Sequence, residues 1–407
     1  MSRFGVLADG RVPAMRRLVV LGACSAVAAL SACGSSHGSS GGSAAKGPIL
    51  IDQSVPVQSQ TTSLPFMQTS AEAAVAEVNA AGGVKGRKLE LTTCDNQYDP
   101  NVSLRCAQQA ISNKNVVATV GGLTGFGAQA DPLYDQAGLA NIGPDAITDA
   151  DATAASSYLL DAGVPGYAAM PAVAKKYLGA TKVAVMDLDN ASASDVNGFF
   201  TAGAALAGVT IVKRILLPVD ATDYSEFVVE AEHAGAQAIV TDNPPPQDLA
   251  LWKALQATHS TLHTVMTDGS VSQSLVTQAG SSAEGDYVTG GVPPADDSTP
   301  TGKAYLAAMK KYQPKEKILT GTGLRAWAAV HLFADVMNAQ SGPVTRSSVK
   351  TAFDKVSGLH FDWIDSLSFD KAGPLKQYPR IVSTVNFPQV VKNGQLTPVA
   401  SFNPFGS

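Results

Sequence analysis

The feature that most constrains the fold is a regular alternation of short apolar runs with amphipathic segments, which begins at Ile49. Each apolar run ends in Gly, Pro or Asp, and a segment with apolar residues at helical spacing follows it. The runs that predict strands are 49–51, 89–93, 116–120, 140–142, 182–186, 210–216, 238–241 and 264–266. The segments that predict helices are 67–78, 102–111, 195–207, 224–234, 247–258, 303–312 and 324–338. This alternation predicts an α/β fold whose parallel sheets are covered by helices on both faces.

The length of the alternating region predicts two lobes, because about 350 residues exceed one comfortable hydrophobic core. In parallel α/β sheets, ligands bind at the carboxyl ends of the strands. Two such lobes facing each other would form a cleft walled by the loops that follow the strands. The tail from residue 362 onward is rich in Pro and Gly, and its strand-like pieces lie at 380–386 and 389–392.

The N-terminus has the pattern of an export signal. Arg16 and Arg17 precede an apolar run over residues 18–32. The run ends in Leu-Ser-Ala-Cys33, which resembles the lipobox of bacterial lipoproteins, where the cysteine receives a diacylglycerol after cleavage just before it. We therefore predict a lipoprotein signal peptide at 1–32 and lipidation of Cys33. Residues 33–47 are mostly Gly and Ser, which predicts a flexible tether.

Three alternatives remain open at this end of the chain. The segment could be an ordinary signal peptide that ends in a chance cysteine. Residues 21–24 also fit the lipobox pattern at Cys24, although too few apolar residues precede them to form an export signal. Translation could start at Met15 instead of Met1, because the stretch from Met15 would still be a signal of normal length.

Two further cysteines, Cys94 and Cys106, lie in the predicted folded body. We expect a disulfide between them, because exported chains occupy compartments where disulfides persist. A bond at this spacing would stabilise the fold by about 3 kcal/mol in the chain-entropy model. A metal site is the alternative, but the spacing is not Cys-x-x-Cys and no histidine lies nearby. The formal net charge of −5 argues against nucleic-acid binding, since no basic surface is indicated.

The stretch from Val78 to Arg87, VNAAGGVKGR, is the most specific motif in the chain. With the strand and helix before it and the acid-rich loop after it, it resembles the opening of type I periplasmic binding proteins. Weaker similarity continues to about residue 400 and includes 117–126, 179–190, 239–247 and the Thr267-Asp268-Gly269 turn. The resemblance is to the leucine/isoleucine/valine-binding branch, the substrate-binding components of ABC importers.

The resemblance implies two doubly wound parallel-sheet lobes, joined by three hinge crossings, that close on a small ligand. The implied crossings lie near 163–168, 291–297 and 365–378. The implied N-terminal lobe comprises 48–165 and 294–370, and the C-terminal lobe comprises 166–293 and 371–400. It also implies ABC permease subunits as partners, no cofactor, no metal and no catalysed reaction. With the lipid anchor, it places the protein on the outer face of the cell membrane.

In this branch, backbone N–H groups and hydroxyls from two loops of the N-terminal lobe receive the ligand's carboxylate. The first loop maps to 121–127, where Gly125 replaces the family's serine and Thr124 offers a hydroxyl. The second maps to 143–148, where Asp145 would repel an anionic ligand unless it points outward. The candidates from these loops and the opening loop are Gln58, Thr124, Gly125, Phe126, Asp145, Ala146 and Thr148. Ordinary strand-to-helix turns are the alternative for both loops.

In the C-terminal lobe, Asp268 matches the acid that binds the ligand's ammonium in the family, and a surface acid in a turn is the alternative. The family's two covering tyrosines map to Ser192 and to about Asn243-Pro244. With Asn190 and Asp242, Ser192 and Asn243 would make the wall polar. A small polar metabolite, such as an amino acid or an amide, therefore fits no worse than a branched-chain ligand.

The sequence offers little support for an enzyme. The six histidines are scattered, no cysteine lies beside a histidine, and no Gly-x-Ser-x-Gly motif occurs. His259 and His263 have the spacing of a metal-ligand pair, but the segment between them is expected to turn toward a strand. We predict an extracytoplasmic substrate-binding lipoprotein of an ABC importer. The alternatives are a ligand-sensing lipoprotein that is not coupled to import and an exported hydrolase.

Overall fold

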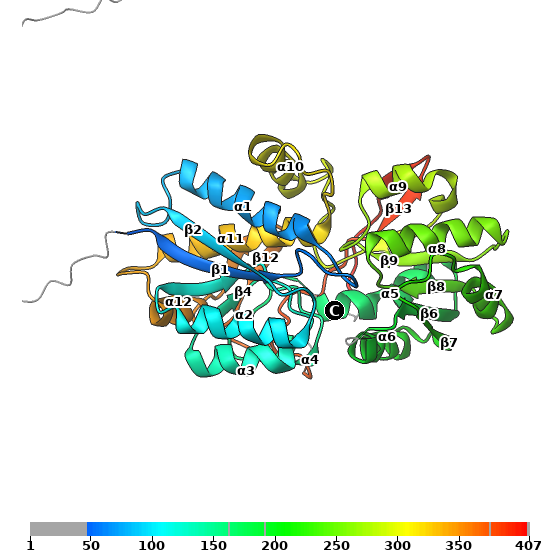
Figure 1. The fold of residues 1–407 in the computed structure, drawn as a ribbon, viewed down its shortest axis with the longest axis horizontal. Helices are drawn as coiled ribbons and strands as arrows, with labels where there is room; N and C mark the ends of the chain where they lie inside the picture. Colours follow the sequence, from blue (N-terminus) through cyan, green and yellow to red (C-terminus); the bar gives the residue numbers. More distant parts are fainter. Residues whose placement is uncertain (1–46, 162, 191–192, 374–375, 405–407) are drawn as a thin grey trace, which may run out of the picture. The chain divides into compact units, whose positions relative to one another are not determined.

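The computed structural model describes residues 47–161, 163–190, 193–373 and 376–404. The predicted signal peptide, Cys33, almost all of the tether and Ser192 lie outside these residues. The described chain contains one five-stranded sheet, one seven-stranded sheet and a small two-stranded sheet (Figure 1). Among the described helices, none combines the length and the apolar character that crossing a bilayer requires.

The five-stranded sheet is parallel throughout, in the order β2-β1-β3-β4-β5. Its strands are β1 (Ile49–Val55), β2 (Leu89–Asp95), β3 (Val116–Val120), β4 (Ala140–Ile142) and β5 (Ser157–Tyr158). Ile49 and Ile51 pack on one face and Leu50 on the other, as the two-residue period of a strand requires. One face is covered by α1 (Pro65–Ala80), α10 (Pro300–Tyr312), α11 (Gly321–Ala339) and α12 (Arg346–Asp354). The other face is covered by α2 (Pro100–Ser112) and α3 (Gly127–Ala137).

The seven-stranded sheet has the order β14-β13-β10-β9-β8-β6-β7. Its parallel strands are β6 (Lys182–Leu188), β7 (Thr210–Leu217), β8 (Ala238–Thr241), β9 (His263–Thr267) and β10 (Tyr287–Thr289). The antiparallel edge consists of β13 (Gln389–Lys392) and β14 (Gln395–Pro398). One face is covered by α5 (Gly163–Leu178) and α6 (Ala193–Ala207). The other face is covered by α7 (Ser225–His233), α8 (Pro245–Ala257) and α9 (Gln273–Ala279).

The chain passes between the two large sheets three times. The passages join β5 to α5, β10 to α10, and the small hairpin of β11 (Leu359–Phe361) and β12 (Ile364–Leu367) to β13. Residues 163–168, expected in a crossing, begin α5, a helix that packs with the seven-stranded sheet. The predicted α/β class with parallel sheets is confirmed, whereas the lobe boundaries stay a prediction.

Most expected elements appear, and the exceptions have physical reasons. The strands at 116–120, 140–142 and 238–241 have the expected bounds. The helix α5 was not expected, because its sequence contains prolines, which interrupt helix patterns. The strand expected at 380–386 is wrong. The Arg380 N–H donates to the Ala152 carbonyl, and the Ile381 N–H donates to the Tyr378 carbonyl. Apart from an isolated bridge between Asn386 and Phe402, this backbone therefore pairs with no strand.

The predicted disulfide joins Cys94, in β2, to Cys106, in α2. It ties the outer strand of the five-stranded sheet to the helix that follows it. Because both sulfurs are used in this bond, the alternative of a metal site at these cysteines is excluded. Elsewhere in the described chain, no three His, Cys, Asp or Glu side chains are grouped so that they could hold a metal.

Reduction of the Cys94–Cys106 bond is expected to lower the free energy of unfolding by about 3 kcal/mol, because the cross-link restricts the unfolded chain. Denaturant titrations with and without a thiol reductant measure this loss. The double variant Cys94→Ser/Cys106→Ser should be as unstable as the reduced protein and should not respond to the reductant. An unchanged midpoint after complete reduction, checked by thiol labelling, would contradict the expectation.

Candidate functional site

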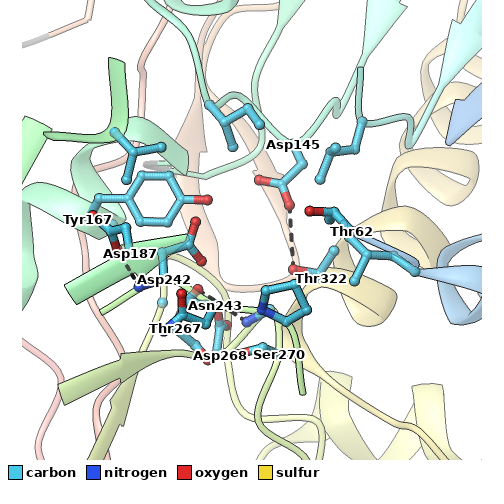
Figure 2. A pocket seen from close by; sticks show the side chains of 18 of the residues that line it. Thr62, Asp145, Tyr167, Asp187, Asp242, Asn243, Thr267, Asp268, Ser270 and Thr322 are labelled. Atoms are coloured by element: carbon cyan, nitrogen blue, oxygen red, sulfur yellow. Dashed lines mark hydrogen bonds between the residues drawn. The ribbon is translucent and has the colours of Figure 1, made fainter. Parts of the chain in front are cut away.

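A polar cavity lies where the parallel strands of both large sheets end. The space inside it, including the part open to solvent, is about 850 Å³. Residues from the five-stranded sheet's loops, the seven-stranded sheet's loops and the start of α11 line it. Its ionisable lining includes one arginine and five aspartates: Arg325, Asp145, Asp161, Asp187, Asp242 and Asp268. Figure 2 shows the Asp145 side chain across the cavity from Asp242 and Asp268.

The five aspartates come from the carboxyl ends of five different parallel strands. Asp145 and Asp161 follow β4 and β5, and Asp187 lies near the end of β6. Asp242 and Asp268 directly follow β8 and β9. The carboxyl ends of parallel strands share one edge of a sheet, where α/β proteins bind ligands. Strand topology alone therefore gathers these acids, although they are distant in sequence.

Arg325 of α11 is the cation of the site and is only 4% exposed. It forms ion pairs with Asp145 and Asp161, and it donates to the Thr322 hydroxyl at 3.3 Å. The same hydroxyl donates to Asp145 at 3.4 Å. A buried guanidinium requires such partners, because desolvation of an unpaired charge costs several kcal/mol. Asp145, which the sequence suggested would repel an anionic ligand, thus pairs with Arg325 in the cavity wall.

Two glycines allow α11 to lie close enough for these ion pairs. Gly121 and Gly143 follow β3 and β4, and both adopt a positive φ. A Cβ atom on Gly121 would lie 2.9 Å from the Cα atom of Ala326, and one on Gly143 would lie 2.6 Å from the Cβ atom of Ala329. Only glycine accepts both this backbone conformation and this approach. Gly121 and Gly143 therefore help to position Arg325 through their contacts with Ala326 and Ala329.

The wall formed by β6 and β8 presents oxygen atoms. The Asp242 N–H donates to Asp187 at 3.0 Å, which links the ends of the two strands. The Asn243 side-chain amide donates to the Thr241 hydroxyl and to the Met186 carbonyl. These bonds hold the Asn243 side chain, and its oxygen has no hydrogen-bond partner in the described chain. The wall thus offers acceptors that a ligand with N–H donors would satisfy.

Asp268 lies in a space made by two glycines. A Cβ atom on Gly290 or on Gly321 would overlap the Asp268 carboxyl group. The Asp268 N–H donates to the Thr289 carbonyl at 3.1 Å, and its own carbonyl accepts from the Gly321 N–H at 3.2 Å. Because Gly321 begins α11, this backbone contact joins the helix over one sheet to the end of the other sheet.

Burial raises the pKa values of the carboxyl groups in the cavity. Burial raises the pKa of Asp145 to about 6, and the Arg325 charge opposes the rise. Burial raises the pKa of Asp242 to about 7, with a further rise from the charge of Asp145. Burial likewise raises the pKa of Asp268 to about 7, against the effect of Arg325. The pKa of Asp187 is well above its ordinary value because the group is buried. Of these groups, Asp242 and Asp268 therefore titrate near neutral pH and Asp145 slightly below it.

Four predicted site residues line the cavity: Asp145, Asn190, Asn243 and Asp268. The other described candidates, Gln58, Thr124, Gly125, Phe126, Ala146 and Thr148, do not line it. Thr124 accepts from the Phe126 N–H, and Thr148 caps the short helix α4 (Asp149–Thr153) with its hydroxyl bonded to Asp151. Ser192 lies outside the described residues.

Tyr98 explains the glycine that stands in place of the family's serine. A Cβ atom on Gly125 would lie 2.6 Å from the Tyr98 ring, and Gly125 has a φ of +70°. Tyr98 itself lines the cavity, so an aromatic ring occupies the space beside this loop. Sequence reasoning placed Asp242 in the polar wall, but it did not assign Tyr98, Asp161, Asp187 or Arg325 to the site. The available signal for Arg325 was a charged residue within an otherwise apolar helix start.

A family model described as "Periplasmic binding protein" matches residues 49–377. The Leu/Ile/Val-binding protein of Escherichia coli strain K12 is 25% identical over 335 residues, covering 76% of this chain and 83% of that protein. The leucine binding protein LivK of Thermotoga maritima has a TM-score of 0.70 at 18% identity and covers 88% of this chain and 99% of its own. The branched-chain amino acid transporter protein LivJ of Streptococcus pneumoniae, solved with isoleucine, has a TM-score of 0.69 at 19% identity and covers 86% and 99%.

Substitution of Asp242 by Asn is expected to change how stability depends on pH. Burial raises the pKa of Asp242 from 3.8 to about 7, so the unfolded chain releases this proton at a lower pH than the folded protein. The ligand-free wild type should therefore lose about 2 kcal/mol relative to Asp242→Asn between pH 5 and pH 8. Chemical denaturation at both pH values measures this difference.

The control for this experiment is Asp220→Asn, which removes an exposed carboxylate in the turn after β7. This variant should follow the wild type across the same pH range. Parallel stability curves for Asp242→Asn and the wild type would show that Asp242 titrates as an ordinary surface carboxylate.

Proposed function

The chain belongs to the periplasmic binding protein family, and on this premise we propose that it is the extracytoplasmic substrate-binding component of an ABC importer. Members of this family bind solutes and do not transform them. The observation that carries the proposal is the cavity itself, which takes polar side chains from the strand ends of both sheets. A solute that contacts both walls would hold them together, which is the behaviour that a capture protein requires.

The proposed movement is a hinge closure of two lobes. The lobes would comprise 48–165 with 294–370 and 166–293 with 371–400, as the resemblance implies. The three passages between the sheets would act as the hinge. Because the walls on both sides of the cavity carry polar groups, closure would replace their hydrogen bonds to water with hydrogen bonds to the ligand.

The proposed ligand is a small polar metabolite related to amino acids or their amides. The relatives are named for binding leucine, isoleucine and valine, and one neighbour was solved with isoleucine. In this chain, Asp145, Asn190, Asn243 and Asp268 are the predicted contacts that line the cavity. These polar contacts favour a ligand with several hydrogen-bond donors, and the aliphatic side chains of Leu64, Ile147 and Leu188 also line the cavity.

The proposed location is the outer face of the cell membrane. The predicted signal at 1–32 and the predicted lipidation of Cys33 would anchor the chain after export. The Gly- and Ser-rich residues 33–47 would then give the folded body freedom to reach permease subunits. Anchoring and coupling to import are the parts of the proposal that need direct tests.

Ligand binding is expected to stabilise the protein by mass action. A compound present at 100 times its Kd should raise the free energy of unfolding by about 2.7 kcal/mol. Thermal denaturation against a panel of amino acids, amino-acid amides and small amines measures this effect. The absence of any stabilising compound across the panel would contradict the proposed function.

The same ligand should bind about fivefold more weakly to Asn243→Ala, because a side-chain hydrogen bond in a buried site contributes about 1 kcal/mol. Titration calorimetry on folded protein gives the affinity. Asn115→Ala is the control, since Asn115 is exposed after α2 and remote from the cavity lining. Equal affinities for wild type and Asn243→Ala would remove this residue from the binding site.

Substitution Cys33→Ala should release the protein from the membrane fraction of the bacterium that produces it, because the thiol that accepts the lipid is absent. Cys24→Ala is the matched control and should leave the protein in the membrane fraction. Fractionation followed by immunoblotting, together with metabolic labelling by a fatty acid, reports both results. Retention of Cys33→Ala in the membranes would reject Cys33 as the lipidated residue.

A further inference from the structure

We propose that the solute held in this cavity is an organic cation, with at least one ammonium or guanidinium group and no free carboxylate. This inference rests on the proposed binding function and narrows its ligand. It follows from the balance of charge in the lining, from the polar atoms that lack partners, and from the shortage of groups that could receive an anion.

The charge balance of the lining is negative. Among the lining residues that the structure describes, Arg325 is the one cation, and it faces five aspartates. Asp145 and Asp161 already pair with Arg325, and all three side chains are buried. The remaining aspartates, Asp187, Asp242 and Asp268, form no ion pair with Arg325, the one cation in the described lining. A positively charged ligand would supply the missing partner.

The polar atoms without partners are mainly acceptors. In the described lining, four oxygen atoms lack a hydrogen-bond partner: Asp161 Oδ1, Asp187 Oδ2, Asn243 Oδ1 and Asp268 Oδ2. Asp187 is 3% exposed and Asn243 is 2% exposed, so water does not freely satisfy them. One donor, Arg325 Nε, also lacks a partner, but two carboxylates already balance its group. Ammonium and guanidinium groups offer donors and no acceptors, which matches this surplus of oxygen atoms.

A carboxylate would find few donors here. Helix α8 begins beside the cavity, but its first residues are Pro244, Pro245 and Pro246, which have no N–H group. The next N–H groups, of Gln247 and Asp248, donate to the Pro244 carbonyl. This helix N-terminus therefore cannot bind an anion in the usual way.

The loops of the five-stranded sheet are equally unsuited to an anion. Thr124 and Thr148 lie outside the lining, and the Thr148 hydroxyl donates to Asp151. Tyr98 lies against Gly125, and Asp145 brings its negative charge to the wall. Two aromatic rings, Tyr98 and Tyr167, also line the cavity, and aromatic faces attract cations.

The test uses matched pairs of compounds that differ by one carboxylate: leucinamide against leucine, and agmatine against arginine. Titration calorimetry at pH 7.5 identifies the pair that contains the tightest-binding compound. Within that pair, the compound without the carboxylate should have a Kd at least tenfold lower than its partner. If leucine or arginine binds as tightly as its partner or more tightly, the inference is overturned, while the proposed binding function stands. If none of the four compounds binds, the result contradicts both the inference and the proposed binding function.

Replacing single aspartates by asparagine tests whether the negative charge of the cavity contributes to the affinity for the cation. Asp268→Asn and Asp242→Asn should each raise the Kd of the tightest cation at least tenfold, and Asp220→Asn, on the exposed turn after β7, should leave it unchanged. Unchanged affinity in both cavity variants would overturn the inference. Circular dichroism and thermal denaturation confirm that the variants compared are folded.

The affinity for a cation should also rise between pH 5.5 and pH 8, because the aspartates must ionise to pair with it. The groups that face Asp242 and Asp268 are Asp145, Asp161, Asp187, Asp248, Tyr167 and Arg325, and none of them supplies a free cation to the cavity. Calorimetry in buffers of different ionisation enthalpy should therefore report proton release on binding. Affinity that is constant across this pH range, with no proton release, would contradict the inference.

Discussion

The site depends on one buried guanidinium. Arg325 holds Asp145 and Asp161 to the start of α11, and so fixes the loops after β4 and β5 relative to a helix that also touches the end of β9. Removing one partner of such a buried pair typically costs about 3–5 kcal/mol, because the other charge is left uncompensated. Gly121 and Gly143 make the arrangement possible by letting α11 approach the sheet. The shape of the cavity and its charge thus have the same origin.

The electrostatics of the cavity follow from where the fold places acids. Parallel strands bring their carboxyl ends to one edge, and an aspartate at each of five such ends produces a concentration of negative charge. Since one arginine balances only part of it, burial and mutual repulsion raise the pKa values of Asp242 and Asp268 to about 7. Under the proposed binding of a cation, these groups would release protons as the ligand binds, which would make the affinity depend on pH.

The sequence predicted the fold well because hydrophobic periodicity is local. The strands at 116–120 and 238–241 were delimited correctly, but α5 was missed because of its prolines, and 380–386 was wrong because tertiary hydrogen bonds turn the chain there. In the site, Asp268 and Asn243 could be found because the family resemblance maps ligand contacts onto them, and both lie just after recognisable strands. Arg325 could not be found in this way, because the topology of the sheet brings its partners Asp145 and Asp161 to it. The glycines that allow α11 to approach the sheet are also recognisable only in the folded chain.

The structure of the protein crystallised with its tightest-binding compound is the most direct test of this account. We expect the compound to lie in the cavity between the two large sheets, with a charged nitrogen within hydrogen-bond distance of Asp242 or Asp268 and with Arg325 still paired to Asp145 and Asp161. A compound bound elsewhere on the protein, or a ligand carboxylate that displaces Asp145 from Arg325, would contradict it.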